Sequence, residues 1–143
     1  MIFMNQEVKL TVPNDIQFLP LITHHIGKIA EMTGFKEKEI SKIELGAEEA
    51  VANVLKHAFE PGEETEFTII TQPMSIGLKL IIKEKGIPFD PSLIPDYKPE
   101  KLTTEFMDRG LGTFLMNKFM DEVSFHNLGK MGKETHLIKY FKD

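Results

Sequence analysis

The segment from Glu49 to His57 carries polar side chains at a spacing suited to chemistry. Glu49, Asn53 and His57 follow one another at intervals of four, so on a helix they project from one side, with Lys56 near them. At about 100° per residue, this side lies roughly opposite the apolar side of the same segment. The amide oxygen of Asn53 could bind Mg²⁺, and the carboxylate of Glu49 could accept a hydroxyl proton. The ordinary alternative is the water-facing side of an amphipathic helix.

A second candidate site lies at the end of an alternating segment. Glu84 continues the positions of this segment that are expected to face inward, which are Ile76, Leu78, Leu80 and Ile82. A buried carboxylate needs a hydrogen-bond donor, and the exocyclic amine of a purine would serve. Gly86 would let a flat ring approach the backbone. The alternative is that the strand ends at residue 83 and Glu84 begins a solvated turn.

A third candidate site precedes a helix-like segment near the carboxyl end. Gly110 and Gly112 stand where a loop meets apolar residues at helical spacing, and Arg109 adds a positive charge. The first N–H groups of a helix have no partner within it and attract anions, so a phosphate could bind there. A Gly-x-Gly pair is also common in an ordinary helix entry.

The elements that must position these residues follow from periodicity and turn residues. We expect a strand over 2–12, a helix from a cap at Asn14 to about residue 33, and a longer helix over 36–59. Gly34 would end the first helix, within whose early part Pro20 falls. The longer helix has one apolar stripe, made of Ile40, Ile43, Ala47, Val51, Val54 and Ala58.

The second half of the sequence predicts a hairpin, a long loop, a helix and two more strands. The hairpin strands are expected over 66–71 and 75–85, around the residues QPM. Residues 87–108 hold four prolines and little periodicity, which favours a functional loop such as a lid. A helix over 110–121 and strands over 122–127 and 133–141 follow. The order predicts an α+β two-layer sandwich, a mixed and mostly antiparallel sheet with helices on one face.

Length, charge and cysteine content limit the class of protein. The chain has 143 residues, which fits one domain over 1–143, and a net charge of −5 without any block of Lys or Arg. Nucleic acid and anionic membranes are therefore not expected as partners. The sequence contains no Cys, which excludes thiolate catalysis and fits a cytoplasmic protein. No window approaches the roughly 20 apolar residues of a membrane span.

Taken together, the three motifs resemble those of the bacterial anti-sigma factor serine/threonine kinases. This family belongs to the larger class of histidine-kinase-like ATPases that includes gyrase, and the resemblance covers about residues 8–141. It implies a Bergerat-type ATP-binding fold that uses ATP and Mg²⁺. It also implies an anti-anti-sigma protein and a sigma factor as partners, and homodimers are common in this class. The three motifs match in the segments ELGAEEAVANVLKHA, EKGIPFDP and RGLGTFLMNKFMDEV, and the closing strand of the family matches in GKETHLIK.

The resemblance assigns roles to individual residues. Asn53 would bind Mg²⁺ and Glu49 would be the catalytic base, with Lys56 and His57 on the phosphate side. Gly110, Leu111 and Gly112 would lend backbone N–H groups to the phosphates. Thr135 resembles the Thr that supports the adenine-reading carboxylate of the family.

The family reads adenine with an Asp where this sequence has Glu84. Glu keeps the charge but is longer by one methylene group, which puts the nucleotide affinity in question. Two functions therefore stay open. One is a kinase that phosphorylates a Ser or Thr of an anti-anti-sigma partner, and the other is a partner-binding module without kinase activity.

Overall fold

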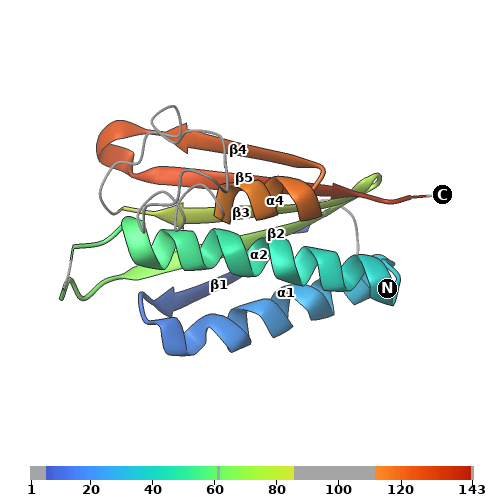
Figure 1. The fold of residues 1–143 in the computed structure, drawn as a ribbon, viewed down its shortest axis with the longest axis horizontal. Coiled ribbons are helices and arrows are strands. Elements are labelled where there is room, and N and C mark those ends of the chain that lie inside the picture. Colours follow the sequence, from blue (N-terminus) through green and yellow to red (C-terminus); the bar gives the residue numbers. More distant parts are fainter. Residues whose placement is uncertain (1–5, 61, 86–111, 143) are drawn as a thin grey trace, which may run out of the picture.

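The computed structural model describes residues 6–60, 62–85 and 112–142. These residues form two layers, a five-stranded sheet and the helices that cover one of its faces (Figure 1). The predicted α+β two-layer architecture is confirmed, but every strand pairing among the described residues is antiparallel, so the expectation of a mixed sheet was wrong there. In spatial order the strands are β1 (Val8–Pro13), β2 (Glu66–Met74), β3 (Gly77–Glu84), β5 (Lys133–Tyr140) and β4 (Glu122–Asn127).

The first helical segment begins later than the sequence predicts. A 3₁₀ turn, η1 (Ile16–Phe18), comes first, and its cap is Asp15, whose carboxylate accepts the N–H of Gln17 at 3.0 Å. Helix α1 (Leu19–Thr33) then starts with Pro20 in its first turn, where a missing N–H breaks no helical bond. The predicted cap, Asn14, instead donates from Nδ2 to the carbonyl oxygen of Glu63 at 2.8 Å. Because Asn14 is occupied in this way, it ties the start of α1 to the loop before β2.

Helix α2 (Glu37–His57) confirms the long helix predicted over 36–59 and forms the centre of the helical layer. Gly34, with a φ of 118°, ends α1 in the left-handed conformation that glycine tolerates, and α2 begins soon after. The apolar stripe of α2 packs into a continuous core with α1 and the inner face of the sheet. Its fully or nearly fully buried members are Ile43, Ala47, Val51, Val54 and the C-cap residue Ala58, and Ala50 beside the stripe is buried as well.

The hairpin of β2 and β3 turns two residues later than expected. Met74 pairs with Gly77, so the turn consists of Ser75 and Ile76 rather than the predicted QPM. Ile76 is therefore exposed and does not belong to the inner face. The rest of the predicted alternation is confirmed, and Glu84 is the last residue of β3 with only 4% of its surface exposed. The alternative of a solvated turn at Glu84 was wrong.

Lys139 of strand β5 links the sheet to helices α4 and α2. Helix α4 (Gly112–Phe119) ends beside this strand, where the ammonium group of Lys139 donates to the carbonyl oxygen of Phe119 at 2.8 Å. The same ammonium lies 3.5 Å from a carboxylate oxygen of Glu39 in α2. Since Lys139 is almost completely buried, this three-way contact fixes the end of α4 against α2 and the sheet.

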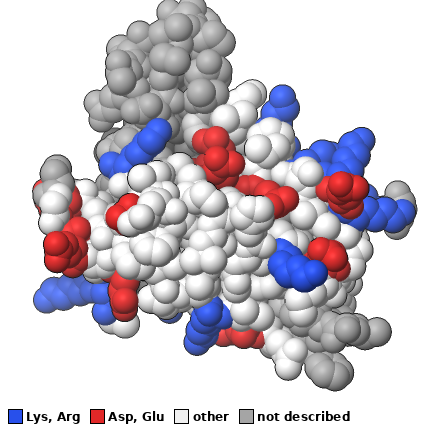
Figure 2. Space-filling view, turned by 90° about the horizontal axis from the view of Figure 1, so that it is seen from below, with Lys and Arg blue, Asp and Glu red and all other residues white. Residues whose placement is uncertain are grey.

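The surface on the side of α1 carries charges of both signs. Figure 2 views the molecule from below Figure 1, and acidic and basic side chains there are interspersed around a broad uncharged area. This face has no stretch of basic side chains like those that follow a nucleic-acid backbone, so far as the described residues show. None of the described helices combines the length and the apolar character that a membrane crossing requires.

Gly132, between β4 and β5, provides a test of how the end of β3 is held. Its φ is 93°, and a Cβ at this position would lie 2.2 Å from the carbonyl oxygen of Glu84. We expect Gly132→Ala to lower the free energy of unfolding by about 2–4 kcal/mol, because it adds a backbone clash to an unfavourable φ. Urea denaturation measures the change.

Gly129→Ala is the matched control for this substitution. Gly129 also has a positive φ, 63°, but a Cβ there would meet no atom within 4 Å. Gly129→Ala should lower the free energy of unfolding by about 1 kcal/mol, because only the unfavourable positive φ acts against the new side chain. Equal losses in the two variants would contradict a close contact between Gly132 and the end of β3.

Candidate functional site

The polar residues of α2 differ in burial more than their spacing suggests. Asn53 is buried, with 8% of its surface exposed, Glu49 is half-buried, and Lys56 is exposed. The alternative of a purely water-facing side is therefore wrong at Asn53. Asn53 follows the buried Ala50 by three residues on the same side of α2, and its side chain is enclosed. The side chain of His57 lies outside the described part of the structure.

Within this group, the amide oxygen of Asn53 gives the strongest indication of a binding site. It is enclosed, and it accepts no hydrogen bond from any group in the described parts of the chain. A buried polar atom without a partner costs free energy, and such atoms are rare in folded proteins. An oxygen held in this way is suited to a cation or to a ligand that completes its bonding. Its chemistry fits Mg²⁺, which prefers oxygen ligands.

Glu49 lies where α2 meets the first residue of α4. A Cβ placed on Gly112 would be 3.7 Å from Oε2 of Glu49, so this carboxylate reaches the amino end of α4. The first and third motifs of the sequence therefore meet in space. Burial raises the pKa of Glu49, and the charge of Glu48 raises the pKa further, while Lys56 opposes the change. A carboxylate with a raised pKa is a better proton acceptor than an exposed one.

The hydroxyl group of Thr113 is a further polar atom at this end of α4. It is enclosed, and within the described ranges it has no hydrogen-bond partner. The sequence analysis did not single it out, because a Thr in a first helical turn has no distinctive pattern. Thr113 adds a donor and acceptor beside Gly112, where the helix exposes its N–H groups.

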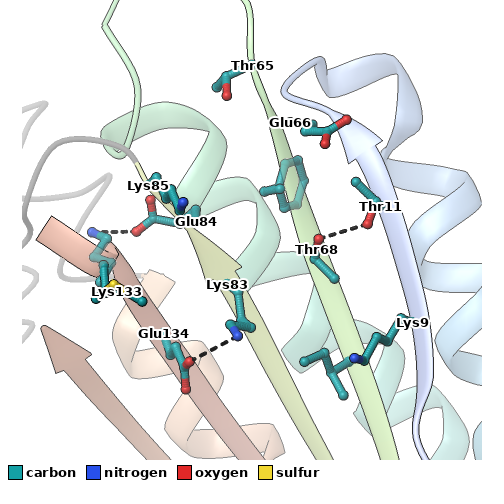
Figure 3. Close-up of a pocket in the computed structure, with 13 residues that line it drawn as sticks. Lys9, Thr11, Thr65, Glu66, Thr68, Lys83, Glu84, Lys85, Lys133 and Glu134 are labelled. Atoms are coloured by element: carbon teal, nitrogen blue, oxygen red, sulfur yellow. Dashed lines mark hydrogen bonds and ion pairs between the residues drawn. The ribbon is translucent and has the colours of Figure 1, made fainter. Parts of the chain in front are cut away.

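Glu84 and Thr135 both lie on the inner face of the sheet, on the neighbouring strands β3 and β5. Thr135 pairs with Ile82 in the register of β3 and β5, and it is 5% exposed. The sequence analysis missed the residue opposite Glu84. Lys133 pairs with Glu84 in the register, and its ammonium nitrogen lies 3.6 Å from Oε1 of Glu84 (Figure 3). Both side chains are more than nine-tenths buried.

A signal for Lys133 was present in the sequence. The segment KETHLIKY alternates, so the residues that share a face with Thr135 also share it with Leu137, which is fully buried. Lys133 belongs to this face because it precedes Thr135 by two residues. The carboxylate of Glu84, which was expected to accept a hydrogen bond from a purine amine, thus already forms an ion pair with the ammonium of Lys133.

Several predicted site residues fall outside the described part of the chain. These are Gly86, Arg109, Gly110 and Leu111, together with the expected lid over 87–108. Their roles stay predictions. Helix α4, expected from residue 110, is described from Gly112 onward.

The described residues contain no group of three or more acidic, His or Cys side chains arranged to hold a metal ion. A cation at Asn53 would therefore rely on oxygen atoms of a ligand and of water. This is the usual situation of Mg²⁺ beside nucleotide phosphates.

A separate hollow of about 520 Å³ lies at the end of the sheet (Figure 3). Side chains from β1, β2, β3 and β5 line it, among them Lys9, Thr68 and Lys83, and neither Glu49 nor Asn53 is among the described lining residues. Glu84 and Lys133 border it. Because the described lining includes neither the polar residues of α2 nor the start of α4, we do not regard this hollow as the main site.

Comparison with known proteins identifies the fold family. A family model described as the histidine kinase-like ATPase domain matches residues 12–139. The chain belongs to this family. The matched range includes Glu49, Asn53, Glu84, Gly112 and Thr135, so the two regions described above lie within one histidine kinase-like ATPase domain.

The relatives of this ATPase domain include serine-protein kinases. The chain is 25% identical to the serine-protein kinase RsbW of Bacillus subtilis (strain 168) over 137 residues, which cover 93% of this chain and 84% of that protein. It is 26% identical to the serine-protein kinase RsbW of Staphylococcus aureus (strain JH9) over 140 residues, with 94% and 87% covered. The resemblance expected from the motifs is therefore confirmed over nearly the whole chain.

The raised pKa of Glu49 gives a testable dependence of stability on pH. A carboxyl group whose pKa is higher in the folded state binds more protons when folded, so stability falls as the pH rises from about 4.5. Glu49→Gln removes this effect. We expect the variant to melt on the order of 1–2 °C above the wild type at pH 7.

The same comparison at pH 4 is the internal control. The advantage of Glu49→Gln should largely disappear there, because the wild-type carboxyl group is then mostly protonated in both states. Glu48→Gln, on the exposed side of α2, serves as the control variant and should change the melting temperature less. A Glu49→Gln variant that melts below the wild type at pH 7 would show that the charge of Glu49 stabilises the fold.

Proposed function

We propose that this ATPase domain is a serine/threonine protein kinase that binds ATP with Mg²⁺ in the space between α2 and the start of α4. The observation that supports this most is the enclosed amide oxygen of Asn53 on the helix whose Glu49 reaches Gly112. One helix thus offers an oxygen for a cation and a carboxylate for a proton. The start of a second helix offers N–H groups for phosphate.

Each group has a distinct role in this proposal. Asn53 holds the cation through its amide oxygen, and Mg²⁺ would supply charge neutralisation for the phosphates when bound. Glu49 accepts the proton of the attacking Ser or Thr hydroxyl, which its raised pKa favours. Gly112 leaves room beside Oε2 of Glu49, since it has no side chain. Lys56, His57, Arg109, Gly110 and Leu111 would line the phosphates, as the family resemblance implies.

The proposed substrate and partner are proteins. The relatives are named serine-protein kinases, which supports a protein hydroxyl as the acceptor. By the family resemblance, the acceptor is an anti-anti-sigma protein, and the unphosphorylated form of that protein would free a sigma factor from this domain. The protein would then act as an anti-sigma factor in transcription regulation, in the cytoplasm and as a possible homodimer.

A second function is favoured by the ion pair of Glu84 and Lys133. If that pair excludes the base, the domain would bind partner proteins without using ATP. Calorimetry separates the two functions, because the kinase requires binding of ATP with Mg²⁺ and the binding module does not.

Phosphoryl transfer to candidate anti-anti-sigma proteins of the same organism tests the kinase. With labelled ATP we expect transfer by the wild type and a loss of about 10²–10⁴-fold in Glu49→Gln, because the proton acceptor is gone. Binding of ATP measured by calorimetry should change little in this variant.

Asn53→Ala is the matched variant for the metal site. It should weaken the binding of ATP with Mg²⁺ far more than the binding of ATP in excess chelator. Transfer that is unchanged in Glu49→Gln would contradict the proposed base. Tight binding of ATP without transfer to any acceptor would favour the binding module.

A further inference from the structure

The ion pair between Glu84 and Lys133 changes what the base-reading end of the site presents. The ammonium of Lys133 and the carboxylate of Glu84 face each other across β3 and β5 at 3.6 Å, with 8% and 1% of their side chains exposed. Figure 3 shows them pointing toward one another at the ends of the two strands. The carboxylate that is expected to accept from the amine of a base therefore has a hydrogen-bond donor, the ammonium of Lys133, beside it.

The backbone holds these two groups in register. Gly132 lies against the carbonyl oxygen of Glu84 so closely that a Cβ there would be 2.2 Å from it. Because Lys133 follows directly, the contact fixes where its side chain leaves the strand. Thr135 adds a hydroxyl on the same inner face, two residues further along β5.

Buried lysines on this strand do not share one role. Lys139 also lies on the inner face of β5, but its ammonium is engaged by the carbonyl oxygen of Phe119 and the carboxylate of Glu39. Those contacts join helices to the sheet, far along the strand from Glu84 in the register. Lys133 instead pairs with the carboxylate that the family resemblance assigns to the base.

The edges of the two common purines differ in what they require. Adenine offers an amine donor and a ring nitrogen acceptor, whereas guanine offers a carbonyl acceptor beside N–H donors. A carboxylate alone accepts from the adenine amine or from the N–H groups of guanine, but it offers no donor to the guanine carbonyl oxygen. An ammonium carries three N–H donors, and it can bond a carboxylate and an acceptor atom of a base together. A carboxylate with an ammonium beside it therefore satisfies either edge.

We propose that Lys133 is a specificity-determining residue that allows this site to take guanine as well as adenine nucleotides. The inference rests on the proposed nucleotide site and concerns its choice of base. The carboxylate of Glu84 accepts from the N–H groups of either purine. The ammonium of Lys133 donates to the ring nitrogen of adenine or to the carbonyl oxygen of guanine.

Calorimetry with non-hydrolysable ATP and GTP analogues and Mg²⁺ at pH 8 tests this. We expect the wild type to bind both analogues with affinities within about tenfold of each other. Lys133→Met should weaken the GTP analogue by about 10–100-fold and the ATP analogue clearly less. The guanine carbonyl oxygen is a stronger acceptor than the adenine ring nitrogen, and without Lys133 it would have no donor beside the acceptor oxygens of Glu84. Lys133→Arg, which keeps a donor, should recover binding of the GTP analogue at least in part.

Two comparisons separate selectivity from folding. Lys139→Met removes a buried lysine from the same strand and should leave the ratio of the two affinities unchanged, whatever it does to the melting temperature. If Lys133→Met does not fold, the ratio of the wild-type affinities for the two analogues tests the inference by itself. A wild type that binds the ATP analogue but prefers it more than about 100-fold would overturn the inference while the nucleotide site stands. Equal weakening of both analogues in Lys133→Met would overturn it too, and no binding of either analogue would overturn the proposed function as well.

Discussion

The meeting of α2 with the first residue of α4 is the constraint on which the whole site depends. Oε2 of Glu49 lies 3.7 Å from the place that a Cβ of Gly112 would occupy. The opposite end of α4 is fixed by Lys139, which joins Phe119 to Glu39 near the start of α2. Helix α4 is therefore held against α2 at both ends. Its first residue is kept beside the carboxylate of Glu49, which precedes Asn53 by one turn of α2.

This arrangement leaves polar groups in costly positions. The amide oxygen of Asn53 and the hydroxyl of Thr113 are enclosed without partners among the described residues, and burial raises the pKa of Glu49. Each feature reduces stability in the absence of a ligand. Binding sites commonly carry such costs, since the groups that a ligand needs cannot also be satisfied by the protein. The cost is a reason to expect a ligand there.

The elements of the fold could be predicted where one periodicity is strong. The stripe of Ile43, Ala47 and Val51 fixed the long helix, and the alternation through Leu78 and Leu80 fixed β3 and the inward direction of Glu84. The predicted helix cap was wrong because two neighbouring residues compete for this position. Asp15 rather than Asn14 caps the first turn, because Asn14 bonds to the chain before β2.

Only those features of the candidate site that depend on a single segment of the sequence could be predicted. The roles expected for Glu49 and Asn53 came from their spacing and from the family resemblance. The burial of Asn53 depends on how the helices pack together, and this packing cannot be calculated from the positions of residues around one helix. Lys133 was missed because its meaning comes from the register of β3 with β5, and separate strand patterns do not specify a register. The pairing of Lys133 with Glu84 is thus a property of the tertiary structure.

The central claim is that the amide oxygen of Asn53 binds the metal ion of a bound nucleotide. The side-chain amide resonance of Asn53 in ¹⁵N-labelled protein, assigned by its loss in Asn53→Ser, tests this most directly. We predict that it shifts when ATP is added with Mg²⁺ and that most of this shift disappears when a chelator removes the metal. A resonance that stays in place while nucleotide and Mg²⁺ saturate the protein would contradict the account.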